Sequence, residues 1–111
     1  MKSKKEEVRY YIVNLTMTNK ISRSVTTANA ICMDGECYTT YSDPNQTNMT
    51  YKSIKKKDST AKLENGVIKT LKPKQTALEI MEKTIGDIKT LKEQLKSLIE
   101  IDYKVEVAFV K

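Results

Sequence analysis

A helix capping signal followed by helical apolar spacing constrains the fold of this chain more than any other feature. Thr76 and Glu79 match the capping box, in which the threonine side chain accepts from a backbone amide and the glutamate reaches back to the cap. Apolar residues then recur three and four positions apart on one broad face: Leu78, Met81, Ile85, Ile88, Leu91, Leu95, Leu98 and Ile99. The pattern predicts one long amphipathic helix that continues to about Glu100.

The segments on either side of this helix have the spacing of strands. Residues 8–18 are rich in β-branched and aromatic residues and are apolar on both faces, which is typical of a strand inside a sheet or under a helix. Apolar residues alternate with others from Tyr103 to Phe109, and this spacing predicts a half-buried strand after the helix.

Two dipeptides that contain glycine predict β-hairpins. Asp34-Gly35 divides residues 24–41, and a two-residue type I′ loop there requires positive φ at both positions. Asn65-Gly66 joins two shorter segments, 60–64 and 67–71. The sequence therefore predicts an α+β fold: an antiparallel sheet of about six strands, with two hairpins and one long helix packed on one face, followed by a C-terminal strand.

The chain has the length of one domain, and we interpret residues 1–111 as a single α+β domain with a flexible N-terminus at 1–6. Residues 42–58 are rich in turn formers and lysine, so they are predicted to form a mobile surface loop. No segment approaches the ~20 apolar residues of a membrane span, and the first residues make a poor signal peptide. We therefore expect a cytoplasmic protein without membrane contact.

The composition argues against catalysis. Histidine is absent, which removes the usual general base and the commonest metal ligand. Only two cysteines are present, too few for a closed zinc site. No glycine-rich phosphate loop occurs. The sequence predicts a non-enzyme that holds no metal and no cofactor.

The two cysteines flank the first predicted turn. With Asp34-Gly35 as the loop, Cys32 faces Cys37 across the hairpin at a non-hydrogen-bonded pair. That geometry makes a disulfide between Cys32 and Cys37 feasible, whereas a reducing cytosol favours two free, partly buried thiols.

The net positive charge of the chain is concentrated in its middle. The formal net charge is +6, and residues 52–74 carry eight lysines against Asp58 and Glu64. The lysines are Lys52, Lys55, Lys56, Lys57, Lys62, Lys69, Lys72 and Lys74. Tyr38, Tyr41 and Tyr51 precede them, and lysines beside flat rings are what a site for nucleic acid or another phosphate-bearing ligand needs. Of the three rings, Tyr41 and Tyr51 are the candidates for stacking on the ligand. The alternative is a solvated lysine-rich loop with tyrosines in the core.

Two functions remain open on these grounds. The first is a small non-enzymatic binding protein that holds nucleic acid or another anionic ligand through the lysine-rich segment and the two tyrosines. The second is a protein-interaction module that recognises an acidic protein surface, such as a phage-encoded inhibitor of a host defence protein or a virion assembly component.

Two further expectations concern source and assembly. The abundance of Lys, Asn, Ile and Tyr suggests an AT-rich coding genome, so we expect a protein of phage or mobile-element type that acts in the host cytoplasm. The broad apolar arc of the helix predicts a homo-oligomer, with a dimer as the commonest closed form.

Overall fold

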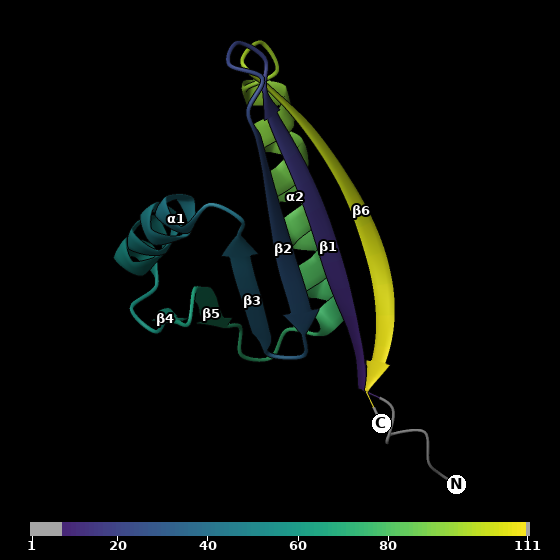
Figure 1. The fold of residues 1–111 in the computed structure, drawn as a ribbon. Coiled ribbons are helices and arrows are strands. Elements are labelled where there is room, and N and C mark those ends of the chain that lie inside the picture. The colour runs from purple at the N-terminus through teal and green to yellow at the C-terminus, as the bar shows by residue number, and fades with distance from the viewer. Residues whose placement is uncertain (1–7, 111) are drawn as a thin grey trace, which may run out of the picture.

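The computed structural model describes residues 8–110, which form a six-stranded sheet and two helices (Figure 1). The strands are β1 Val8–Asn19, β2 Val25–Met33, β3 Glu36–Tyr41, β4 Lys62–Glu64, β5 Val67–Leu71 and β6 Ile99–Val110. They lie in the order β4-β5-β3-β2-β1-β6, and all neighbours are antiparallel. The predicted α+β class and six-stranded antiparallel sheet are confirmed. The flexible terminus predicted at 1–6 lies outside the described residues.

Both predicted hairpins are present, but the type I′ turn predicted for the first one is not. Asn65 and Gly66 both have positive φ, at 51° and 77°. In the first turn Gly35 has a φ of 77° while Asp34 does not have positive φ, so the type I′ prediction is wrong there. The Asp34 carboxylate instead accepts a hydrogen bond of 2.7 Å from the amide of Ala77, which ties this turn to the start of the following helix.

Helix α2 (Ala77–Gln94) begins as predicted and ends earlier than predicted. Thr76 and Glu79 form the complete capping box. The helix is capped at Leu95, and β6 starts at Ile99, so the expected continuation to about Glu100 is wrong. The apolar pair at 98 and 99 fits helical spacing, but Ile99 and the residues after it alternate across the sheet and pair with β1.

The predicted loop at 42–58 is wrong, because Pro44–Lys57 form a second helix, α1. Asp43 is its N-cap and accepts from the amide of Asn45 at 3.0 Å, and Pro44 occupies the first turn, where proline is favoured. Thr47 is the buried residue of this helix. A polar sequence with an N-cap and an N-terminal proline thus forms a helix, and its buried residue, Thr47, packs against the sheet.

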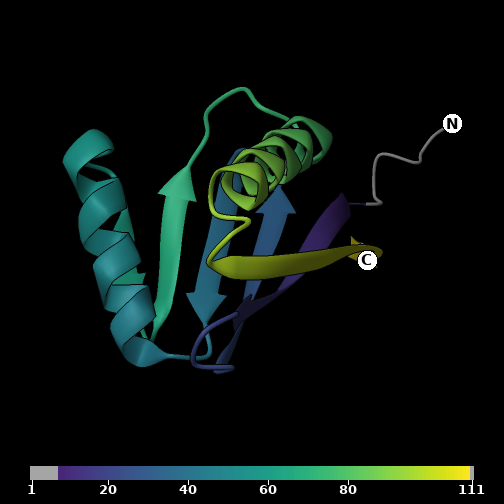
Figure 2. The ribbon, with the colours of Figure 1, turned by 90° about the horizontal axis from the view of Figure 1, so that it is seen from above.

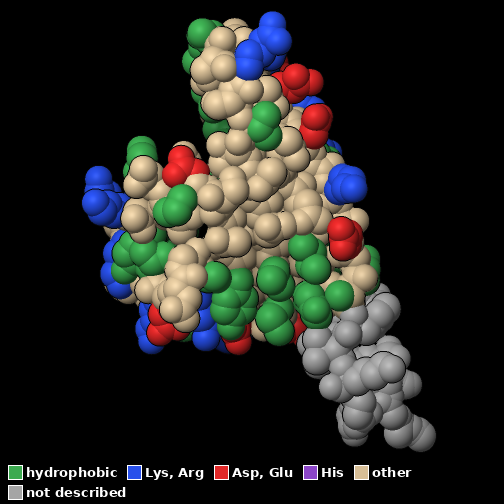
Figure 3. Space-filling view, in the orientation of Figure 1, with side chains coloured by type: hydrophobic (Ala, Val, Ile, Leu, Met, Phe, Trp, Pro, Cys, Tyr) green, Lys and Arg blue, Asp and Glu red, His purple; other side chains and the backbone are tan. Residues whose placement is uncertain are grey.

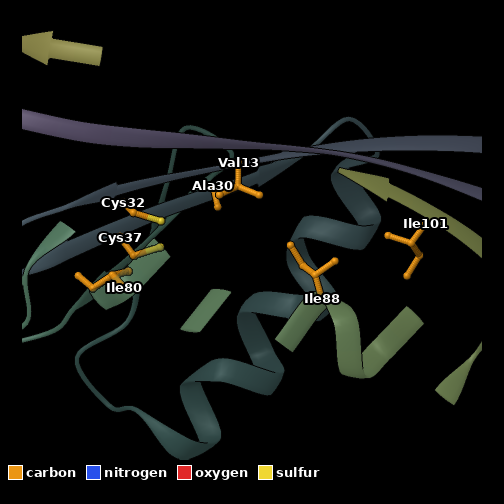
Figure 4. Close-up of a cluster of buried hydrophobic side chains, with 7 residues drawn as sticks. All are labelled: Val13, Ala30, Cys32, Cys37, Ile80, Ile88 and Ile101. Carbon is orange, nitrogen blue, oxygen red and sulfur yellow. The ribbon is translucent and has the colours of Figure 1, made fainter. Parts of the chain in front are cut away.

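Both helices lie on the same side of the sheet. Figure 2 shows α2 over one face of the strands and α1 at the flank beside β5. The core beneath α2 combines side chains from β1, β2, β3, β6 and the helix (Figure 4). Its buried members are Val13, Ala30, Cys32, Cys37, Ile80, Ile88 and Ile101. The interior position of β1, between β2 and β6, agrees with its two partly apolar faces.

The other face of the sheet carries no helix. Figure 3 shows this open face, with a broad area of neutral polar side chains above a band of hydrophobic ones. Asn14 and Asn29 lie opposite each other in the polar area and are hydrogen-bonded through their side chains. A sheet with one face packed and one face solvated is usual for antiparallel strands. Among the described residues, no helix or strand covers this open face.

Candidate ligand-binding surface

The eight lysines of residues 52–74 lie on one flank of the molecule, which we call the basic flank. Four lie on α1, Lys62 lies on β4, Lys69 lies on β5, and Lys72 and Lys74 follow β5. Figure 3 shows blue side chains gathered along this side. The lysines of α1 form one basic area, and Lys62 with Lys69 on the open face of the sheet form a second, while Lys72 and Lys74 lie beyond the end of β5.

The α1 area brings one predicted tyrosine together with three predicted lysines. Tyr51, Lys52, Lys55 and Lys56 line an open surface hollow. Lys55 Nζ also donates to two backbone carbonyls just beyond the helix, at 2.7 and 3.0 Å. Lys55 therefore helps to end α1, while Lys52 and Lys56 remain exposed.

The sheet area is built by strand register. Lys62 lies opposite Lys69, and Lys69 lies opposite Tyr38, so the three residues form one row across β4, β5 and β3. Lys69 Nζ is 5.7 Å from the centroid of the Tyr38 ring, within cation–π range, and 3.6 Å from a Glu36 carboxylate oxygen. The row places the Lys69 ammonium group beside an aromatic ring on an uncovered face, with Lys62 next to Lys69 on the outer strand.

Glu36 partly balances the charge of this row. The Tyr38 hydroxyl donates to the Glu36 carboxylate, and this hydrogen bond, aided by the charge of Lys69, lowers the pKa of Glu36. The same bond raises the pKa of Tyr38. The nearby carboxylate raises the pKa of Lys69. At neutral pH, Lys69 is therefore charged and partly neutralised by its neighbour.

An apolar hollow adjoins the row. Tyr10, Ile31, Met33 and Tyr38 line an open depression of about 380 Å³ on the same face. Two tyrosine rings, the branched side chain of Ile31 and the flexible side chain of Met33 give a surface on which a flat or apolar group can rest.

The charge of the open face changes sign from one edge to the other. β6, at the edge opposite β4, carries exposed Glu100, Asp102 and Glu106 with Lys104 among them. The basic flank thus lies at one edge of the sheet and an acidic strand at the other. An anionic ligand is favoured at the β4–β5 side of the face and disfavoured at the β6 side.

The structure places Tyr41 away from both basic areas. It lines a cleft of about 240 Å³ between α1 and α2, together with Ile54 and Ile88, on the face that the helices cover. The backbone amide of Tyr41 donates to Thr47 Oγ1 at 3.1 Å, which helps to hold α1 against the sheet. Tyr41 contributes to the packing of α1.

The remaining predicted lysines lie where α1 and β5 end. Lys57 is exposed in the last turn of α1. The Lys72 amide donates to the carbonyl oxygen of Gly35 at 2.8 Å, and Lys74 has a positive φ of 69° in the connection to α2. These three residues belong to the basic flank but do not join the row on the sheet.

The predicted pairing of Cys32 with Cys37 is present in the register, and both are free thiols. Both are buried under α2. A hydrogen bond from the Cys32 thiol lowers the pKa of Cys37 to about 7, with smaller help from Thr39 and from the charge of Lys72. The same contact, together with burial, raises the pKa of Cys32.

Tyr38 and Tyr10 were not among the predicted site residues. The signal was in the first hairpin, because its register fixes which side chains share a face. With Cys37 directed into the core, Tyr38 must point to the other side, and Lys69 faces it only because β5 pairs with β3. No sequence motif indicates that β5 pairs with β3.

No family model, curated protein or solved structure matches this chain. Within residues 8–110, no helix is both long and apolar enough to cross a membrane. In the same part of the chain, no three potential metal-binding side chains (Cys, Asp or Glu) gather in one place.

Proposed function

We propose that this chain is a non-enzymatic binding protein that holds a single-stranded nucleic acid on the open face of its sheet, at the β4–β5 side. The observation that carries the proposal is the row Lys62–Lys69–Tyr38, in which cations and an aromatic ring lie side by side on an uncovered face. Sequence-tolerant binding of single strands uses this combination, with ammonium groups on phosphates and rings on bases.

The neighbouring surfaces support the same ligand. The hollow beside Tyr38 offers a second ring, Tyr10, for another base. From Lys62 at the β4 edge, the exposed Lys52 and Lys56 of α1 extend the positive potential round the flank. The absence of histidine from the sequence and the free state of both thiols are consistent with a binding role in a reducing compartment such as the cytoplasm.

The test compares two lysine variants in their binding to a fluorescent oligonucleotide, measured by anisotropy at several salt concentrations. Lys62→Ala with Lys69→Ala removes two phosphate contacts, so the slope of log affinity against log salt becomes shallower by roughly 1.4. Lys89→Ala with Lys92→Ala removes the same charge from the exposed surface of α2 and leaves the slope unchanged.

A second substitution separates stacking from charge. Tyr38→Ala removes the ring and weakens binding by about tenfold, in line with the ~1–3 kcal/mol measured for one stacked base. Tyr38→Phe keeps the ring and retains most of the affinity. Binding that is absent, independent of salt, or equally reduced by the α2 control contradicts the proposal.

A protein partner is the second candidate function, and the apolar character of the hollow favours it. Ile31 and Met33 suit an apolar anchor side chain of a partner, while the basic flank suits acidic residues around that anchor. An inhibitor of a host protein or an assembly component would need such an apolar hollow with basic residues around it. Met33→Asp would then abolish capture of one partner from the native host, while oligonucleotide binding would be absent from the start.

A further inference from the structure

The two edges of the sheet differ strongly. β4 has three residues and lies close to α1. β6 has twelve residues, pairs with β1 over its full length and has no second neighbour among the described strands. Proteins usually protect an exposed edge with a short strand, charged side chains, a proline, a bulge or a covering element, and of these β6 has charged side chains on its open-face side. Residues 99–110 contain no proline and no glycine, and their register with β1 is continuous.

On the side of the sheet that faces the helices, β6 remains apolar even where no helix covers it. Ile99, Ile101 and Tyr103 belong to the core or pack against it. Val105 and Val107 continue on the same side of the strand and are 36% and 53% exposed. The uncovered part of β6 therefore presents valines along an edge whose outer backbone groups have no partner within the described chain.

The open-face side of β6 carries charges in an order that selects one self-pairing. Glu100, Asp102, Lys104 and Glu106 alternate with the apolar residues. In an antiparallel pair, directly opposite side chains lie on the same face, so each register of β6 against a second β6 fixes which charges meet. These registers can be compared residue by residue.

We propose that β6 pairs antiparallel with β6 of a second copy, about a two-fold axis that passes through Val105. Lys104 then faces Glu106 of the partner subunit, and the two-fold repeats this attraction. On the helix side, Val105 faces its own copy, and Tyr103 faces Val107 of the partner subunit. Every pair formed by these residues is either apolar or oppositely charged.

Neighbouring registers are worse. An axis at Lys104 brings the two lysines together. An axis at Tyr103 pairs Lys104 with Asp102 but sets Glu100 against Glu106 of the partner subunit. A shift of one residue turns the second sheet over and places charged side chains opposite the valines. Charge complementarity therefore selects a second copy in one register, and the two sheets join with all helices on one side.

The test uses charge reversal, with the full chain studied by sedimentation velocity over a range of concentrations. Lys104→Glu and Glu106→Lys each place like charges opposite one another twice, so each weakens the dimer by about tenfold. The double variant Lys104→Glu with Glu106→Lys restores opposite charges in the same register and returns the affinity close to that of the parent. Lys83→Glu, which changes the net charge equally on α2, has no effect.

Two checks keep the test decisive. Glu106 accepts a hydrogen bond of 3.1 Å from Asn14, so thermal melts must show that Glu106→Lys remains folded. Val105→Cys should form a covalent dimer on oxidation because the two Cα atoms at the axis are about 4.5–5.5 Å apart, whereas Lys89→Cys should not. A strict monomer at all concentrations, or a dimer that Lys104→Glu leaves unchanged, overturns the proposal.

Discussion

At the residue scale, the contact between Cys32 and Cys37 shifts the pKa values of the two thiols in opposite directions. Both thiols are buried, and burial alone raises the pKa of a thiol. The hydrogen bond between them acts in opposite directions on its two ends, because it stabilises the acceptor as a thiolate and holds the proton on the donor. Cys37 is therefore the residue that ionises near neutral pH.

The free energy of unfolding should show this ionisation. The folded pKa of Cys37, about 7, lies below its ordinary value of 9.0, so the added stability is present above pH 9 and is lost as pH falls through 7. We expect the difference in stability between the parent and Cys37→Ser to grow from pH 6.5 to pH 8.5 by an amount on the order of 1 kcal/mol. Denaturant titrations at the two pH values measure it, and an unchanged difference means that Cys37 stays protonated.

Glu36 is the residue expected to limit the affinity for an anionic ligand. Its carboxylate lies 3.6 Å from Lys69 and competes with any phosphate for that ammonium group. Glu36→Gln should therefore tighten oligonucleotide binding by about threefold to tenfold at low salt, an effect that salt screens.

Glu82→Gln removes an equal charge from the exposed surface of α2 and serves as the control. Equal gains in the two variants would show that only net charge matters and would remove the basis for a site at Lys69.

At the element scale, the two helices are attached to the sheet in different ways. α2 buries Ala77, Ile80 and Ile88, whereas α1 buries Thr47. Burial of apolar side chains dominates stability, so α1 should open more readily than the rest of the fold.

Substitution of the two caps tests this difference. Asp43→Ala removes the cap of α1, which costs about 1 kcal/mol and should speed amide exchange in Pro44–Lys57 by about fivefold without change elsewhere. Thr76→Ala removes the matching cap of α2 and should lower the stability of the whole fold by a similar amount. Hydrogen exchange read by mass spectrometry separates local from global effects, and equal exchange profiles for the two variants would contradict the assignment.

The difference in what the two helices bury also explains why α2 was predicted from the sequence and α1 was not. α2 was found because a capping box precedes apolar residues at helical spacing, two independent signals for one element. α1 was missed because Thr47, which it buries, is polar, and its start at Asp43 and Pro44 resembles a turn. The end of α2 was misplaced because Ile99 fits both a helical face and the first inward position of a strand.

At the scale of the whole molecule, the lysine-rich segment was located from the sequence but its shape was not. Net charge along the chain identifies residues 52–74 without knowledge of the fold. Whether Lys69 lies beside Tyr38 depends on the pairing of β5 with β3, which joins strands separated by α1 and β4. Pairings between distant segments are set by the global packing of the sheet, so the two basic areas and the position of the Tyr38 ring beside Lys69 could be located only in the structure.

The pairing of β1 with β6 has a consequence for how the chain acquires its structure. These strands come from opposite ends of the described chain, and Val8 lies across from Val110. During synthesis β1 cannot pair with β6 until β6 has been made, whereas the hairpins and α2 can form earlier. We expect a slow final step in which β6 docks, and until then the unsatisfied side of β1 is the place where a newly made chain is most open to mispairing.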